Sequence, residues 1–135
     1  MSEPHMIGTT LHHYRITKAL GSGGMGEVFL AEDTRLKRSV AIKILPPTFA
    51  VDSERRERFE REAQAIAALN HPNIVTIHGV EQSGDTHFIV MELVDGQTLA
   101  DVIPKGGLPL DRLLAIAVPP ADAVAAAHEQ GIAHR

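Results

Sequence analysis

The sequence predicts an α+β fold in which five strands and one helix precede a helical C-terminal third. One observation is a set of three strand-like segments, which start at Tyr14, Gly26 and Ser39. Another is a pair of later strands, 74–81 and 87–93, separated by a short Ser-Gly-Asp turn that is typical of a hairpin. Between the two groups, the apolar residues follow a helical period rather than a strand period.

The helix between the third and fourth strands is predicted to pack on the sheet. The third strand ends at Pro46–Pro47, because proline cannot donate a hydrogen bond to a sheet. Phe59, Ala63 and Ile66 then fall on one face at helical spacing. His71–Pro72 ends this helix, because a residue before proline avoids helical backbone angles.

The helix termini and the C-terminal helices are also indicated by single residues. Asp52 or Ser53 can cap the first helix, since their side chains accept hydrogen bonds from free backbone N–H groups. Two more helices are expected at 98–103 and 111–129. Pro119–Pro120 lies inside the second of these and predicts a kink or break there, because proline removes a helical hydrogen bond.

Three glycines after the first strand indicate a phosphate-binding loop. Gly21, Gly23 and Gly26 match the pattern G-x-G-x-x-G. The pattern alone is also compatible with an ordinary glycine-rich hairpin or with a dinucleotide site. In dinucleotide-binding folds these glycines open a helix, whereas here the strand-like segment 26–33 follows them. This context favours a flap of two strands whose backbone N–H groups can approach phosphate oxygens.

A lysine and a glutamate are candidates for a buried ion pair. Lys43 lies in the largely apolar strand Ser39–Leu45, and a buried ammonium group requires a partner. Glu62 lies beside the apolar face of the predicted helix and could turn toward Lys43. The alternatives are a lysine that reaches solvent at a strand edge and a glutamate that stays on the helix surface.

Several segments, taken in order, resemble protein kinases, and in particular bacterial serine/threonine kinases. Their glycine loop, second strand and Val-Ala-Ile-Lys strand are similar to LGSGGMGEVFLAEDTRLKRSVAIK. Their regulatory helix and the strand after it are similar to RFEREAQAIAALNHPNIVTIHG, and their hinge resembles HFIVMELVDGQTL. The final segment HEQGIAHR resembles the approach to their catalytic loop. The resemblance covers residues 14–135.

The resemblance implies a particular domain organisation. An N-terminal arm, 1–13, would precede a kinase small lobe and hinge at 14–95, built from a five-stranded antiparallel sheet plus one helix. The first helices of the large lobe would occupy 96–135 and stop at the catalytic loop.

The resemblance also implies an ATP site. Lys43 would contact the α- and β-phosphates, and Glu62 would hold Lys43 in place. Val28 and Ala41 would pack on adenine, Met91 would be the gatekeeper, and the backbone of Glu92 and Val94 would bind the adenine edge. The residues assigned to nucleotide binding are Leu20, Gly21, Ser22, Gly23, Gly24, Met25, Gly26, Glu27, Val28, Ala41, Lys43, Met91, Glu92 and Val94.

By this resemblance, the complete kinase would transfer the γ-phosphate of ATP to serine or threonine hydroxyls of proteins, with Mg²⁺. The catalytic aspartate would follow Arg135, and the Mg²⁺ ligands would lie further on. We therefore expect residues 1–135 alone to lack phosphotransferase activity. The alternatives are a non-catalytic nucleotide-binding or interaction module and, less favoured by the strand after the glycines, a dinucleotide-dependent oxidoreductase.

The composition excludes several other classes of protein. The chain has 135 residues, a formal net charge of -4 and no cysteine, so a nucleic-acid-binding surface and thiolate metal sites are not expected. The eight histidines show no complete metal motif, because Ile132 replaces the second histidine of a His-Glu-x-x-His pattern at His128. No apolar run is long enough to span a bilayer, and a cytoplasmic location is expected.

Overall fold

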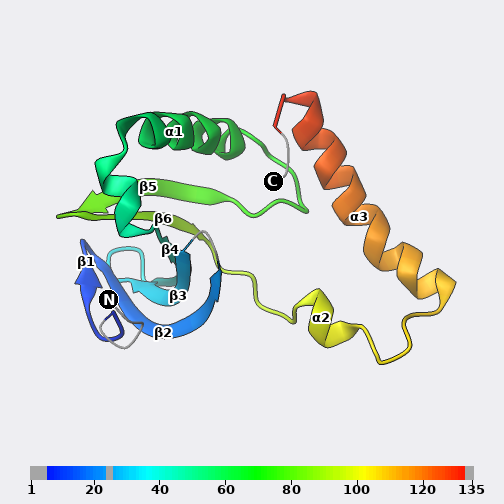
Figure 1. The fold of residues 1–135 in the computed structure, drawn as a ribbon. Coiled ribbons are helices and arrows are strands. Elements are labelled where there is room, and N and C mark those ends of the chain that lie inside the picture. Colours follow the sequence, from blue (N-terminus) through cyan, green and yellow to red (C-terminus); the bar gives the residue numbers. More distant parts are fainter. Residues whose placement is uncertain (1–5, 24–25, 133–135) are drawn as a thin grey trace.

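A computed structural model describes residues 6–23 and 26–132. Its six strands form a single sheet, and its helices follow the fourth and sixth strands (Figure 1). The strands are β1 (Thr10–Leu11), β2 (Tyr14–Gly23), β3 (Gly26–Asp33), β4 (Arg38–Ile44), β5 (Ile77–Ser83) and β6 (Thr86–Glu92). The helices are the 3₁₀ helix η2 (Pro47–Val51), α1 (Ser53–Ala67), α2 (Leu99–Val102) and α3 (Leu110–Glu129).

The sheet is antiparallel throughout and confirms the five predicted strands. Its strand order is β1-β2-β3-β4-β6-β5, and every neighbouring pair is antiparallel. Figure 1 shows that β2, β3 and β4 curl strongly beneath β5 and β6. Two register shifts in β2, at Ile16/Lys18 and Ala19/Gly21, add twist to that strand.

The N-terminal arm contributes a sixth strand that the sequence did not predict. β1 pairs with β2, and Leu11 is buried in the core. His12, directly after β1, has its Nε2 2.7 Å from the carbonyl oxygen of Gln82 on β5, so this contact links the chain next to one edge strand with the other edge strand. Alternation over two residues is too short to be recognised in a sequence.

The main core lies on one face of the curled sheet. It is formed by buried side chains from β1, β2, β3, β4 and β6, which are Leu11, Tyr14, Ile16, Phe29, Ala31, Val40, Ile42, Phe88 and Val90. The alternation of these residues along β3, β4 and β6 places their neighbours in sequence on the opposite face. That second face carries α1, and its smaller apolar cluster joins Leu45 and Ile89 to Phe59 and Ile77.

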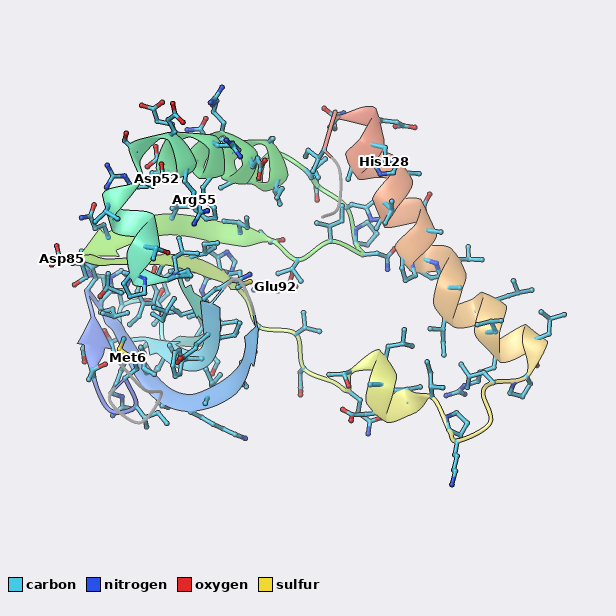
Figure 2. The ribbon with its side chains drawn as sticks, viewed as in Figure 1. Met6, Asp52, Arg55, Asp85, Glu92 and His128 are labelled. Carbon is cyan, nitrogen blue, oxygen red and sulfur yellow. The ribbon has the colours of Figure 1, made fainter. Side chains whose placement is uncertain are left out.

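Helix α1 begins where the sequence predicts. The side chain of Asp52 accepts a hydrogen bond from the Arg55 N–H at 3.1 Å, which makes Asp52 the N-cap (Figure 2). After the helix, β5 begins at Ile77 rather than at the predicted Ile74. The segment before it is held by a different contact, because the Thr76 N–H donates to the carboxylate of Glu92 at 3.0 Å.

Of the kink or break predicted at Pro119–Pro120, the break is wrong. Helix α3 runs unbroken through Pro119 and Pro120. The fixed φ of proline is itself compatible with a helix, and its costs are the lost hydrogen bond to the carbonyl four residues earlier and the contact of its ring with that carbonyl. For Pro119 that carbonyl belongs to Ala115, which is exposed and can bond to water instead. Within the described residues, no helix is both long and apolar enough to cross a membrane.

Candidate nucleotide-binding site

The glycine-rich segment forms the predicted hairpin of β2 and β3. Gly21 pairs with Val28, and Gly23 pairs with Gly26. Gly24 and Met25, at the tip of the hairpin, lie outside the described residues. The segment is therefore followed by a strand and does not open a helix, which removes the structural basis for a dinucleotide fingerprint.

Two of the glycines have different structural settings. Gly21 is exposed, and a Cβ added to it would meet no atom within 4 Å. Gly26 has a φ of 125°, and a Cβ there would collide with the backbone oxygen of Ile44. At Gly21 neither a side chain nor a neighbouring atom blocks the approach of a ligand, whereas Gly26 is required by the close approach of β3 to β4.

The register of the sheet brings the predicted site residues to one face. Lys43 pairs with Val28 on β3 and with Ile89 on β6, and paired residues of an antiparallel sheet share a face. Gly21 joins the same row through its pairing with Val28. A short apolar row thus leads from the glycine hairpin to Lys43, a half-buried residue.

A second row on that face carries the predicted adenine contacts. Ala41 pairs with Leu30 on β3 and with Met91 on β6, so all three lie on the same face as Lys43. Ala41 is buried, with 7% of its surface exposed. Its side chain is a single methyl group, so it extends only a short way from the sheet. The row is apolar, which is the chemistry that a flat ring requires of a packing surface.

The predicted hinge begins where β6 leaves the sheet. Figure 2 shows Glu92 at this point, between the sheet and the segment that runs to α2. Its N–H donates to the Thr76 carbonyl at 2.8 Å, and its carboxylate accepts from the Thr76 N–H at 3.0 Å. Glu92 is thereby fixed in place, while Val94 beyond it is 66% exposed. Leu20 and Glu27, also assigned to the site, lie in β2 and β3 next to the glycines.

Helix α1 lies on the Lys43 side of the sheet, as the predicted ion pair requires. Phe59 of α1 packs against the cluster of Leu45 and Ile89, and Ile89 is the partner of Lys43 in the sheet. Glu62 follows Phe59 by three residues, so it lies within one turn of the helix from this contact. Glu62 is exposed to solvent. The Lys43–Glu62 ion pair stays a prediction.

A cavity lies elsewhere, between α1 and β5. It has a volume of about 310 Å³ and is lined by Glu60, Ala63, Gln64, Ala67, Ile77, His78, Gly79 and Val80. None of these residues is assigned to nucleotide binding. Burial lowers the pKa of His78 below its ordinary value, since an apolar setting disfavours the charged imidazolium.

Sequence reasoning also missed a buried carboxylate that orders the turn between β3 and β4. Asp33 is 2% exposed and accepts hydrogen bonds from the N–H groups of Arg35 and Leu36, both at 2.9 Å. These bonds, that from Leu36 above all, hold the pKa of Asp33 below its ordinary value of 3.8. His13 Nε2 lies 3.5 Å from the same carboxylate. The sequence feature that could have indicated this role is an acidic residue, Asp33, at the end of a predicted strand.

The comparisons with known proteins identify the family. The protein kinase domain matches residues 14–135, so the chain belongs to the protein kinase family. Its relatives include bacterial serine/threonine kinases. PrkC of Bacillus subtilis is 46% identical over 123 residues, which cover 90% of this chain and 19% of that protein. The kinase pkn2 of Myxococcus xanthus is 43% identical over 122 residues, which cover 90% of this chain and 15% of that protein.

A solved structure gives the same result for the fold. The crystal structure of the Mycobacterium tuberculosis PknI kinase domain matches with a TM-score of 0.76 at 36% identity, over 95% of this chain and 53% of that chain. The predicted small lobe with the first helices of the large lobe is confirmed by this match. The chain spans about half the length of that kinase domain and a fifth or less of the two curated relatives.

Proposed function

We propose that residues 14–135 are the ATP-binding portion of a serine/threonine protein kinase. The observation that carries the proposal is the shared sheet face on which Gly21, Val28, Ala41, Lys43 and Met91 lie together. It combines an open backbone for phosphates, a charged group for phosphate oxygens and an apolar surface for a base. Family membership supplies the reaction class, which is transfer of the ATP γ-phosphate to protein hydroxyls.

The residues of this face fit ATP by their chemistry. Phosphate oxygens accept hydrogen bonds, and the exposed backbone at Gly21 and the three N–H donors of Lys43 can supply them. Ala41 and Val28 would cover one side of the adenine ring. The carbonyl of Glu92 and the backbone of Val94 would meet its polar edge, since the hinge leaves the sheet at that point.

Lys43 would act on the nucleotide by position. Its ammonium group would hold the α- and β-phosphates, and Glu62 on α1 would fix the direction of that side chain. Protein kinases use Mg²⁺ together with ATP, and Mg²⁺ neutralises charge on the transferring phosphoryl group. By the resemblance, the residues that hold the metal ion and the catalytic aspartate are not among residues 1–135. We therefore propose that residues 1–135 bind ATP without transferring phosphate, in the cytoplasm where ATP is available.

Calorimetric titration of the chain with ATP and with NAD tests this proposal. We expect binding of ATP in preference to NAD, at an affinity below that of a complete kinase because part of the cleft is supplied by later residues. Lys43→Met should weaken ATP binding, and Gly23→Val should weaken it by placing a side chain in the path of the phosphates. Preferential binding of NAD that is lost in Gly23→Val would contradict the kinase interpretation.

A further inference from the structure

The turn that follows α1 fixes the ring of a histidine. The carbonyl of His71 accepts a hydrogen bond from the Ile74 N–H at 3.1 Å, which closes a four-residue turn. Pro72 has no N–H, so the first donor inside this turn is the N–H of Asn73. That N–H donates to Nδ1 of the His71 ring at 3.0 Å. One ring nitrogen of His71 is therefore already used by its own turn.

The second ring nitrogen reaches across to α3. Nε2 of His71 lies 3.1 Å from Oδ2 of Asp122. The side chain of His71 is 15% exposed and that of Asp122 is 74% exposed. The imidazole ring is therefore largely covered, whereas the carboxylate that it meets lies on the exposed surface of α3. Figure 1 shows the connection between α1 and β5 extending toward the middle of α3. The bond thus joins the sheet portion of the chain to its C-terminal helix.

The two contacts together determine where the ring carries its proton. A backbone N–H can only donate, so Nδ1 of His71 must present a lone pair to Asn73. The proton of a neutral ring is then on Nε2, which donates to the carboxylate of Asp122. In a charged ring both nitrogens carry protons, and the Asn73 N–H would face another N–H. The contact therefore requires an acceptor on α3, but not a negative charge.

We propose that His71 and Asp122 are positioning residues that hold α3 against the α1–β5 turn through a neutral, Nε2-protonated imidazole. Asn73 sets the tautomer, and Asp122 receives the proton. Helix α3 leads directly to the segment that resembles the approach to a kinase catalytic loop. The bond therefore helps to fix the spacing between the nucleotide-binding sheet and that segment. This consequence rests on the proposed function, whereas the contact and its tautomer do not.

Nitrogen-15 NMR of the unsubstituted chain at neutral pH tests the tautomer directly. We expect Nδ1 of His71 to show the shift of an unprotonated ring nitrogen and Nε2 that of a protonated one. A ring with the proton on Nδ1, a charged ring, or a ring that averages both tautomers would overturn the proposal. His128 is a matched reference within the same spectrum, because it is an exposed histidine on α3 (Figure 2).

Distance measurements between spin labels test the positioning role. The chain has no cysteine, so Arg58→Cys on α1 and Ala125→Cys on α3, both at exposed positions, give a unique pair of labels. In this background we expect a narrow distance distribution that is lost in Asp122→Ala. Asp122→Asn should restore it, because the amide oxygen still accepts a hydrogen bond.

The remaining variants separate the possible outcomes. His71→Ala should lose the narrow distribution, and the control His128→Ala should keep it. An Asp122→Asn distribution as broad as that of Asp122→Ala would mean that the charge is required and would refute the neutral bond. A narrow distribution in Asp122→Ala would refute the positioning role; this carboxylate is exposed, so its removal leaves the core intact. ATP titration of the same samples tests the proposed function separately. If Asp122→Asn restores the narrow distance distribution but the samples do not bind ATP, the positioning role stands and only the proposed function is refuted.

Discussion

Alanine at Gly26 is expected to destabilise the fold, although this glycine belongs to a loop that the family uses for phosphates. The φ of 125° at Gly26 is unfavourable for any residue with a Cβ. An added Cβ would collide with the carbonyl oxygen of Ile44 and lie 3.2 Å from its carbon. Both atoms belong to the backbone of β4, so they cannot rotate away as the end of a flexible side chain could.

The size of the effect follows from two costs and one gain. Backbone strain at this φ costs about 1–3 kcal/mol. Relief of the collision would loosen the ladder at the Glu27–Ile44 pair, and each lost backbone hydrogen bond costs about 0.5–1.5 kcal/mol. Alanine lowers the entropy of the unfolded chain, which returns about 0.4–1 kcal/mol. With one hydrogen bond lost, the net destabilisation is about 2 kcal/mol, or a fall in Tm of roughly 7 °C for a chain of this length.

Thermal unfolding followed by circular dichroism measures this change, and Gly21→Ala is the matched control. Gly21 has open space around its Cβ position, so its replacement should change the free energy of unfolding by less than about 1 kcal/mol. In ATP titrations the order of the two variants should reverse. Gly21→Ala should weaken ATP binding more than Gly26→Ala does, because its added methyl group crowds the phosphates. Equal Tm values for the two variants would refute the close approach of β3 to β4.

Three further outcomes are expected. The lowered pKa of Asp33 means that its ionised form stabilises the fold at pH values above the ordinary value of 3.8, and that this contribution is lost as the pH falls through the lowered value. Asp33→Asn should therefore flatten the acid limb of the pH–stability profile measured by denaturant titration, and an unchanged limb would contradict this. Leu113 and Leu114 on α3 are 45% and 52% exposed, so Leu113→Gln with Leu114→Gln should reduce dye binding and self-association, which sedimentation can follow. In a radiolabel transfer assay, residues 1–135 should transfer no more phosphate than the Lys43→Met variant; greater transfer would show that residues 1–135 contain a catalytic base, whose loss typically costs about 10²–10⁴-fold.

Most of the sheet could be predicted from the sequence because five of the strands described span seven or more residues. In β3 and β4, Phe29, Ala31, Val40 and Ile42 alternate with the residues of the opposite face, so the pattern gives both the strands and their buried side. β1 could not be predicted in this way, because two residues show no period. Its position depends on tertiary structure, which includes the burial of Leu11 in the core and the contact of His12 with Gln82, seventy residues later.

The candidate site was predictable to a different degree on each element. Gly21, Val28 and Lys43 are close in sequence to motifs with known chemistry, and the pairing of β2, β3 and β4 then brings them onto one face. The structural role of Gly26 required the structure, since nothing in the spacing of the glycines distinguishes a residue that a ligand approaches from one that a neighbouring strand approaches. Only the position of Ile44 makes this distinction.

His71 shows why the remaining contacts could not be predicted. In the sequence, His71–Pro72 indicated only the end of a helix, and the residue before a proline would do this whatever its side chain. Its function in the structure depends on both ring nitrogens, one toward Asn73 and one toward Asp122 on a distant helix. The local bond to Asn73 selects the tautomer, and that choice makes the ring a donor toward α3. A backbone turn therefore sets the chemistry of a contact between two separate parts of the chain, and this coupling arises only when both are in place.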